Sequence, residues 1–191
     1  MRTTTDAWSV RRRSGGVLVV GIVLVASTSG CTVPIDAVAG ISVTGDGRLL
    51  GVMMVCGHRI DGATLYVGGT DTTDADTDAD TDADADVKAG SWVADRPLEA
   101  GLHTWSLESP SSGWTTTDPP GPLAAATAYT LYGWTKDNSW SSSSVSFTSA
   151  DRVRLTPDTV RYEGASDESD RSAVTVTVPL AEFEAEACGD N

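Results

Sequence analysis

Residues Leu123 to Phe147 read LAAATAYTLYGWTKDNSWSSSSVSF, and this stretch decides the fold. Its first half, Tyr129 to Trp134, is rich in aromatic and β-branched residues and predicts a β-strand. The polar run Thr135 to Ser139 predicts a tight turn, because Asp, Asn and Ser favour turn conformations. A return strand then runs from Trp140 to Phe147, so the stretch predicts a β-hairpin with a tryptophan on each side of its turn.

Strand patterns recur at short spacing on both sides of this hairpin. A second hairpin is predicted where two apolar strands flank Gly45-Asp46-Gly47, and Gly113 to Pro122 is predicted to be a loop. No long amphipathic helix is indicated. The further predicted strands are Ile41–Thr44, Leu49–Cys56, Ala63–Val67, Ser91–Val93, Gly101–Leu107 and Val174–Val178. The pattern predicts an all-β fold, an antiparallel sandwich of about seven to eight strands over residues 41–150, with 151–191 as a C-terminal extension packed on it.

The pattern Leu123-x-x-x-Thr127-x-Tyr129-x-Leu131 resembles the tyrosine corner of fibronectin type III domains. The resemblance implies an immunoglobulin-like or fibronectin-like sandwich in which Tyr129 begins the sixth strand. Its hydroxyl is then expected to bond back to the preceding loop. The segment Leu131 to Trp140 is also similar to one in uncharacterised exported actinobacterial proteins, which implies no activity.

The tyrosine-corner register assigns faces to the hairpin side chains. Because side chains alternate along a strand, Tyr129 is expected to face inward and the residues next to it outward. The strip of outward aromatics and the polar turn form the candidate binding residues: Tyr132, Trp134, Lys136, Asp137, Asn138 and Trp140. Trp134 and Trp140 could form a cross-strand pair. Three alternatives stay open: a face that binds a glycan or a protein, a face covered by Val174–Val178, or a register that puts these rings in the core.

The N-terminus has the layout of an export signal. Arg11-Arg12-Arg13 precedes an apolar run from Val17 to Ala26, and small residues lead to Cys31. The ending resembles a bacterial lipobox, which implies a signal peptide over 1–30, lipidation of Cys31 and a short tether over 31–40. An uncleaved transmembrane anchor and an ordinary signal peptide of a secreted protein are the alternatives. All three interpretations predict an extracytoplasmic protein. The lipoprotein and the uncleaved anchor also place it at the cell membrane.

Cysteine count and charge agree with export. Lipidation of Cys31 would leave Cys56 and Cys188, which predicts a disulfide in an oxidising compartment, with two free thiols as the alternative. The whole chain carries a net charge of −14. Without residues 1–30, which hold four arginines and one aspartate, 9 basic and 26 acidic residues remain, a net charge of −17. A nucleic-acid partner is excluded, because phosphate binding needs a positive field.

An Asp-rich repeat interrupts the strand pattern after Val67. Residues 71 to 86 are eight Asp with only Thr and Ala between them, and Asp falls at alternate positions from Asp74. This composition offers almost no apolar surface to bury, so residues 71–90 are predicted to be a disordered insertion. A calcium site at Asp74, Asp76 and Asp78 is the alternative, although the glycine and closing glutamate of an EF-hand loop are missing.

No catalytic motif is present. The chain lacks Gly-x-Ser-x-Gly, His-Glu-x-x-His, a glycine-rich phosphate loop and Cys-x-x-Cys. Its two histidines, His58 and His103, have no partner that the sequence identifies. The prediction is therefore a non-enzymatic, cofactor-free envelope lipoprotein with a binding or structural role. The alternatives are a carbohydrate-binding module that uses exposed Trp and Tyr, and a secreted hydrolase that uses His58 or His103.

Overall fold

The computed structural model describes residues 32–68, 87–164 and 174–189. Thr32–Asn191 forms one compact unit, and the fold below is that of this unit. The all-β prediction is confirmed, because the described residues hold eleven strands in one sheet and only two short helices. The elements are β1 Ile35–Val43, β2 Leu49–Val55, β3 Ile60–Val67, β4 Val87–Leu98, β5 Gly101–Ser106, β6 Trp114–Asp118, β7 Ala128–Trp134, β8 Ser141–Ser143, β9 Val145–Thr148, α1 Ser149–Arg154, β10 Thr159–Gly164, β11 Val174–Pro179 and α2 Leu180–Glu186.

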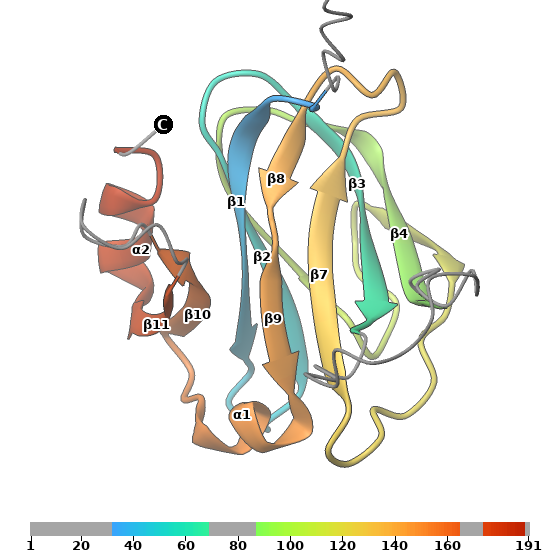
Figure 1. Cartoon of the computed structure of the whole chain (residues 1–191), viewed down its shortest axis with the longest axis vertical. Helices are drawn as coiled ribbons and strands as arrows, with labels where there is room; N and C mark the ends of the chain where they lie inside the picture. Colours follow the sequence, from blue (N-terminus) through green and yellow to red (C-terminus); the bar gives the residue numbers. More distant parts are fainter. Residues whose placement is uncertain (1–31, 69–86, 165–173, 190–191) are drawn as a thin grey trace, which may run out of the picture. The chain divides into compact units, whose positions relative to one another are not determined.

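Strand β1 is the centre of the sheet (Figure 1). One edge of β1 pairs with β2 along its length, and β2 pairs with β5. The other edge is shared: its first half pairs in parallel with β8, and Gly40 and Ile41 pair with β10. From β8 and β9 the sheet continues through β7, β3 and β4 to β6. The sheet is nearly closed into a barrel.

Three tryptophans pack together between β5 and β6, two of the end strands of the sheet. Trp105 on β5 stacks on Trp114 on β6, with ring centroids 4.3 Å apart and planes 24° from parallel. Trp105 also meets Trp92 edge-on at 6.5 Å. The Trp105 ring lies flat on Gly51, where a Cβ would come within 2.4 Å of it, so only glycine leaves room for the indole. The core is therefore built around Trp105 (2% exposed).

The predicted hairpin is present, with its return strand divided into β8 and β9, and the side chains of β7 and β9 face as expected. Tyr129, Leu131 and Gly133 are buried, and the residues between them are partly exposed. On the return strand, Val145 and Phe147 are buried. The Tyr129 hydroxyl accepts a hydrogen bond of 2.9 Å from the backbone N–H of Ala124, which confirms the predicted link to the preceding loop.

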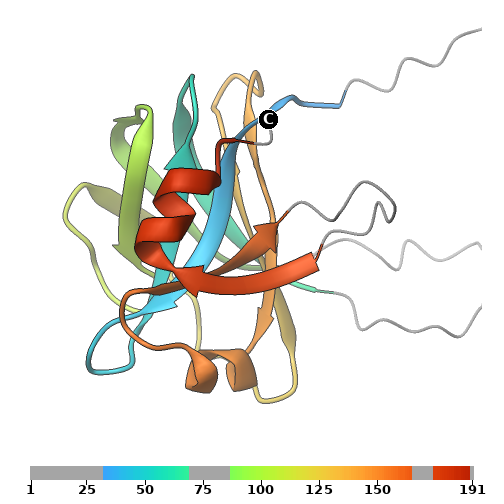
Figure 2. The ribbon, with the colours of Figure 1, turned by 90° about the vertical axis from the view of Figure 1, so that its left-hand side faces the viewer.

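The C-terminal segment joins the sheet and also covers part of it. β10 and β11 form a hairpin beside β1, and α2 lies across β1 and β2 (Figure 2). Phe183 of α2 is fully buried in a second, smaller cluster with Val38, Val52 and Val160. The predicted Cys56–Cys188 disulfide is present, with Cα atoms 5.5 Å apart, and ties the end of α2 to the end of β2.

Several predicted boundaries are wrong. Most of the predicted tether 31–40 is strand, since β1 begins at Ile35 and its apolar residues are buried on both faces. Residues 87–90 were assigned to the insertion, but they begin β4, because they pair with β3. The predicted loop Gly113–Pro122 contains β6, whose Thr-rich sequence pairs with β4. The strand count therefore exceeds the predicted seven to eight. The remaining insertion residues, 69–86, and the candidate calcium ligands lie outside the described residues.

Glu163 on β10 gives a pH-dependent prediction. Burial raises the pKa of its carboxyl, and a backbone hydrogen bond from Ser146 partly offsets this. Because the folded pKa lies above the unfolded one, folding stability is lost as pH rises through the range just above 4.5. Glu163→Gln, which keeps an acceptor, is expected to raise the free energy of unfolding at pH 7 by no more than about 0.5 kcal/mol, because solvent screens this partly exposed carboxylate. Chemical denaturation at pH 4 and pH 7 measures the free energy of unfolding of both proteins. An equal gain in this free energy at the two pH values contradicts the prediction. The exposed Glu184→Gln is the control.

Candidate functional site

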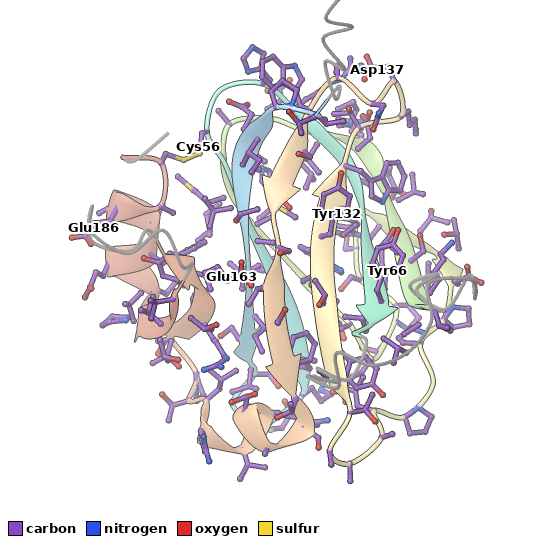
Figure 3. The ribbon with its side chains drawn as sticks, in the orientation of Figure 1. Cys56, Tyr66, Tyr132, Asp137, Glu163 and Glu186 are labelled. Atoms are coloured by element: carbon purple, nitrogen blue, oxygen red, sulfur yellow. A yellow bond between two sulfur atoms is a disulfide. The ribbon has the colours of Figure 1, made fainter. Side chains whose placement is uncertain are left out.

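An open cleft of about 750 Å³ lies at the end of the unit where β1 begins. Three chain connections form it: the loop between β2 and β3, the turn between β4 and β5, and the turn between β7 and β8. Figure 3 labels Asp137 at this end of the sheet. The lining residues are Gly57, His58, Arg59, Pro97, Glu99, Ala100, Asp137, Ser139 and Trp140.

The β7–β8 turn is held by its own side chains. The Thr135 hydroxyl oxygen accepts hydrogen bonds from the backbone N–H groups of Ser139 (2.9 Å) and Trp140 (3.0 Å). Asn138 has a positive φ of 56°, a conformation that Asn adopts more readily than most residues. Asp137 accepts hydrogen bonds from the hydroxyl (2.6 Å) and backbone N–H (3.2 Å) of Ser139. These bonds to Ser139, with smaller contributions from Thr135 and Arg59, lower the pKa of Asp137 to about 2.

Trp140 stacks on His58 within the cleft. The ring centroids are 3.6 Å apart and the planes 21° from parallel. Asp36 near the start of β1 fixes the histidine: its carboxylate lies 3.1 Å from His58 Nδ1 and accepts hydrogen bonds from the backbone N–H groups of Gly57 and His58. The His58 side chain stays 52% exposed, so the stacked pair presents an aromatic surface to solvent.

Arg59 lies between two carboxylates next to this pair. Its Nη2 donates to Asp137 at 2.9 Å, and its Nε lies 3.9 Å from Asp61. Asp61 is buried (4% exposed) and accepts the backbone N–H of Lys136 at 2.8 Å, which ties the turn to β3. The cleft therefore offers paired donors and acceptors with no excess positive charge at Arg59. Among the residues that the structure describes, no group of three His, Cys, Asp or Glu side chains could hold a metal ion.

The predicted aromatic strip divides into two places. Trp134 and Trp140 do not pair across the strands, because Trp134 is opposite Ser141. The Trp134 ring lies over Gly62 and donates its indole N–H to Thr64 at 2.9 Å. Trp140 turns into the cleft instead.

Tyr132 stays on the outer face of the sheet, as predicted, together with Tyr66 from β3 (Figure 3). With Thr130 and Ser144 they line a shallow depression of about 320 Å³. The alternative in which Val174–Val178 covers the strip is wrong, because Val178 packs in the Phe183 cluster and no residue of β11 lines this depression. Of the candidate binding residues, the structure brings Asp137 and Trp140 together in the cleft, while Lys136 and Asn138 are exposed in the turn above it.

Sequence reasoning missed Arg59, Glu99 and the role of His58 as a stacking partner. His58 and Trp140 are far apart in the sequence, and their contact depends on how two loops meet. The predicted sandwich offered a signal, because in that fold the B–C and F–G loops lie at the same end. His103, the second histidine, lies on β5 with its Nε2 2.7 Å from the Glu99 carbonyl oxygen.

The Asp36–His58 pair has the arrangement that orients a general base. A hydrolase would also need a nucleophile in contact with the histidine. The cleft hydroxyl, Ser139, donates instead to Asp137. Asp36 is also engaged with two backbone N–H groups, which is typical of a carboxylate that shapes a loop.

The chain matches no protein-family model, no curated protein sequence and no solved structure. Neither of the two helices in the described residues has the length and apolar character that a membrane span requires.

Proposed function

We propose that this protein is an extracytoplasmic, membrane-anchored binding protein without enzymatic activity, and that it binds a sugar in the cleft. The observation that carries the proposal is the stacked His58–Trp140 pair beside the Arg59–Asp137 ion pair. An aromatic surface packs against the apolar face of a sugar ring, while adjacent donors and acceptors bind its hydroxyl groups. A protein ligand on the outer face at Tyr66 and Tyr132 is the alternative binding mode.

The fold that we propose is a variant of the immunoglobulin-like or fibronectin-like sandwich. In that family strands A, B and E share one sheet, and strands C, F and G share the other. The orders β1-β2-β5 and β3-β7-β8/β9 support this assignment, as does the Tyr129 hydroxyl bond. Here the parallel pairing of β1 with β8 joins the two groups of strands. In such a sandwich the cleft occupies the end where loops carry binding residues.

Trp140→Ala is expected to weaken glycan binding by about ten-fold, since a stacked aromatic contributes about 0.5–1.5 kcal/mol in addition to the apolar area that it buries, and about 1.4 kcal/mol corresponds to ten-fold. Screening the full-length protein on a glycan panel and titrating the best ligand by calorimetry tests this. Tyr132→Ala is the matched control, because it removes a partly exposed aromatic outside the cleft. A larger loss with Tyr132→Ala than with Trp140→Ala would move the site to the outer face. A panel without any binding would remove the proposal.

The anchor has a separate test. Cells that express the full chain are labelled with a fatty-acid analogue, and incorporation is compared with Cys31→Ser. Incorporation that requires Cys31 supports a lipoprotein. An unlabelled wild type with retained membrane association favours the uncleaved anchor, and release into the medium favours a secreted form.

A further inference from the structure

The cleft is physically joined to the start of β1. The backbone carbonyl of Pro34 accepts hydrogen bonds from the backbone N–H (2.9 Å) and hydroxyl (3.2 Å) of Ser141, the residue after Trp140. Two residues after Pro34, Asp36 holds His58 against Trp140. β1 therefore begins at the rim of the cleft, at the same end as the β7–β8 turn (Figure 1).

The length of chain before Pro34 limits how far an anchor can lie from this rim. Cys31 precedes Pro34 by three residues, and a fully extended chain spans at most about 3.3–3.6 Å per residue. An anchor at Cys31 would thus hold the rim of the cleft within roughly 11 Å of the point where lipid is attached. α1 lies at the opposite end of the unit from the start of β1 (Figure 1).

From this geometry we infer that the cleft faces the membrane and that its ligand is the uncharged sugar headgroup of a membrane lipid. The inference rests on the proposed function, because it needs both the N-terminal anchor and sugar binding. The inference adds to the proposed function that the sugar belongs to a membrane lipid and that it enters the cleft from the membrane side.

Size and charge select this ligand over others. A stable protein partner needs about 800 Å² of contact on each side, and a globular domain with a radius of gyration near 13 Å does not fit into a gap of roughly 11 Å. An anionic headgroup would need free positive charge, but Asp137 and Asp61 already flank Arg59. A neutral sugar needs only the aromatic surface and the paired polar groups that line the cleft.

Orientation is measured with two reporters on the full-length anchored protein. Lys136 is exposed in the turn beside the cleft and does not line it, and Val153 is 85% exposed on α1 at the other end. With Cys56 and Cys188 in a disulfide and Cys31 lipidated, Lys136→Cys or Val153→Cys gives a single thiol for a fluorescent label. Phosphatidylcholine vesicles containing a headgroup-bound quencher are expected to quench the label at 136 several-fold more than that at 153. Equal quenching, or stronger quenching at 153, overturns the inference.

The ligand is tested with the label at 136 and vesicles that carry a dihexosyl diacylglycerol. The label is expected to respond to this lipid at bulk concentrations where the free dihexose gives no response, because a sugar on the same vesicle has a high effective concentration. Inserting about twenty Gly/Ser residues between Cys31 and Pro34 should reduce this advantage by roughly twenty-fold, since effective concentration falls with about the −3/2 power of linker length. Trp140→Ala should weaken the response by about ten-fold.

The outcomes separate the two proposals. A response that depends on Trp140, is the same for free and lipid-borne sugar, and is unchanged by the insertion overturns the inference but leaves the sugar-binding proposal in place. Absence of any Trp140-dependent response to free or lipid-borne sugars overturns both.

Discussion

Replacing Cys56 and Cys188 with serine is expected to lower the free energy of unfolding by about 2–5 kcal/mol. The bridge spans a sequence separation of 132, and a cross-link that closes so long a loop removes much of the conformational entropy of the unfolded chain. The loss is large against the 5–15 kcal/mol typical of a domain. The fall in denaturant midpoint between the wild type and the double variant measures it.

The same bridge holds α2 in place. The cluster beneath α2 has five buried members, against twenty-one in the main core, so the covalent link carries much of its attachment. After reduction, the amides of α2 are expected to exchange with solvent earlier than those of β3 and β7. Cys31→Ser is the matched control and should leave the unfolding free energy unchanged. A wild type whose midpoint does not move on reduction would contradict the prediction.

Trp105→Ala is expected to cost about 3–5 kcal/mol, the range for removing a large buried aromatic. Trp105 is 2% exposed and contacts Trp114 and Trp92 across the gap between β5 and β6, strands that do not pair with each other in the described ladders. Because β5 and β6 are joined here by side-chain contacts and not by backbone pairing, removing the indole leaves a cavity that weakens their attachment. Urea denaturation followed by near-ultraviolet circular dichroism measures the loss.

A second variant tests the same contact by changing Gly51, the residue against which the Trp105 ring packs. Gly51→Ala would place a Cβ within 2.4 Å of the Trp105 ring and is expected to cost about 1–3 kcal/mol through overpacking. Gly45→Ala, at a glycine with open space around it, is the control. A Trp105→Ala variant that loses less than about 1 kcal/mol would show that the sheet does not depend on this closure.

The sequence predicts local faces well, since these depend on alternation along one strand. Tyr129 and Val145 face inward as expected, because a strand with one buried face has only one register that keeps its apolar residues inside. The disulfide could also be predicted from the sequence, because it follows from the cysteine count. β6 was missed because Thr115 to Thr117 carry no apolar alternation, and the strand forms by pairing with β4.

Only some of the residues of the cleft could be predicted from the sequence. Asp137 and Trp140 belong to the hairpin turn and were identified with it, whereas His58 and Arg59 reach them from another loop. Trp140 also precedes β8, so it does not follow the strand alternation used to place it beside Trp134. Its direction is set instead by the Thr135 bonds within the turn and by the distant Asp36–His58 pair.

The position of the disulfide also has a mechanical consequence. If the protein is stretched between its N-terminus and its C-terminal end, tension passes from β1 through β2 to Cys56 and crosses the bridge directly to Cys188. The chain between the two cysteines, which includes the tryptophan core and the β7–β8 turn, bears no load along its backbone. Forced extension of the oxidised unit would release only the segment up to Cys56, roughly 85 Å of contour length. Reduction would make the rest of the domain extensible, so the redox state of one bond determines whether a pull on the two ends of the chain unfolds the whole domain or stops at its second strand.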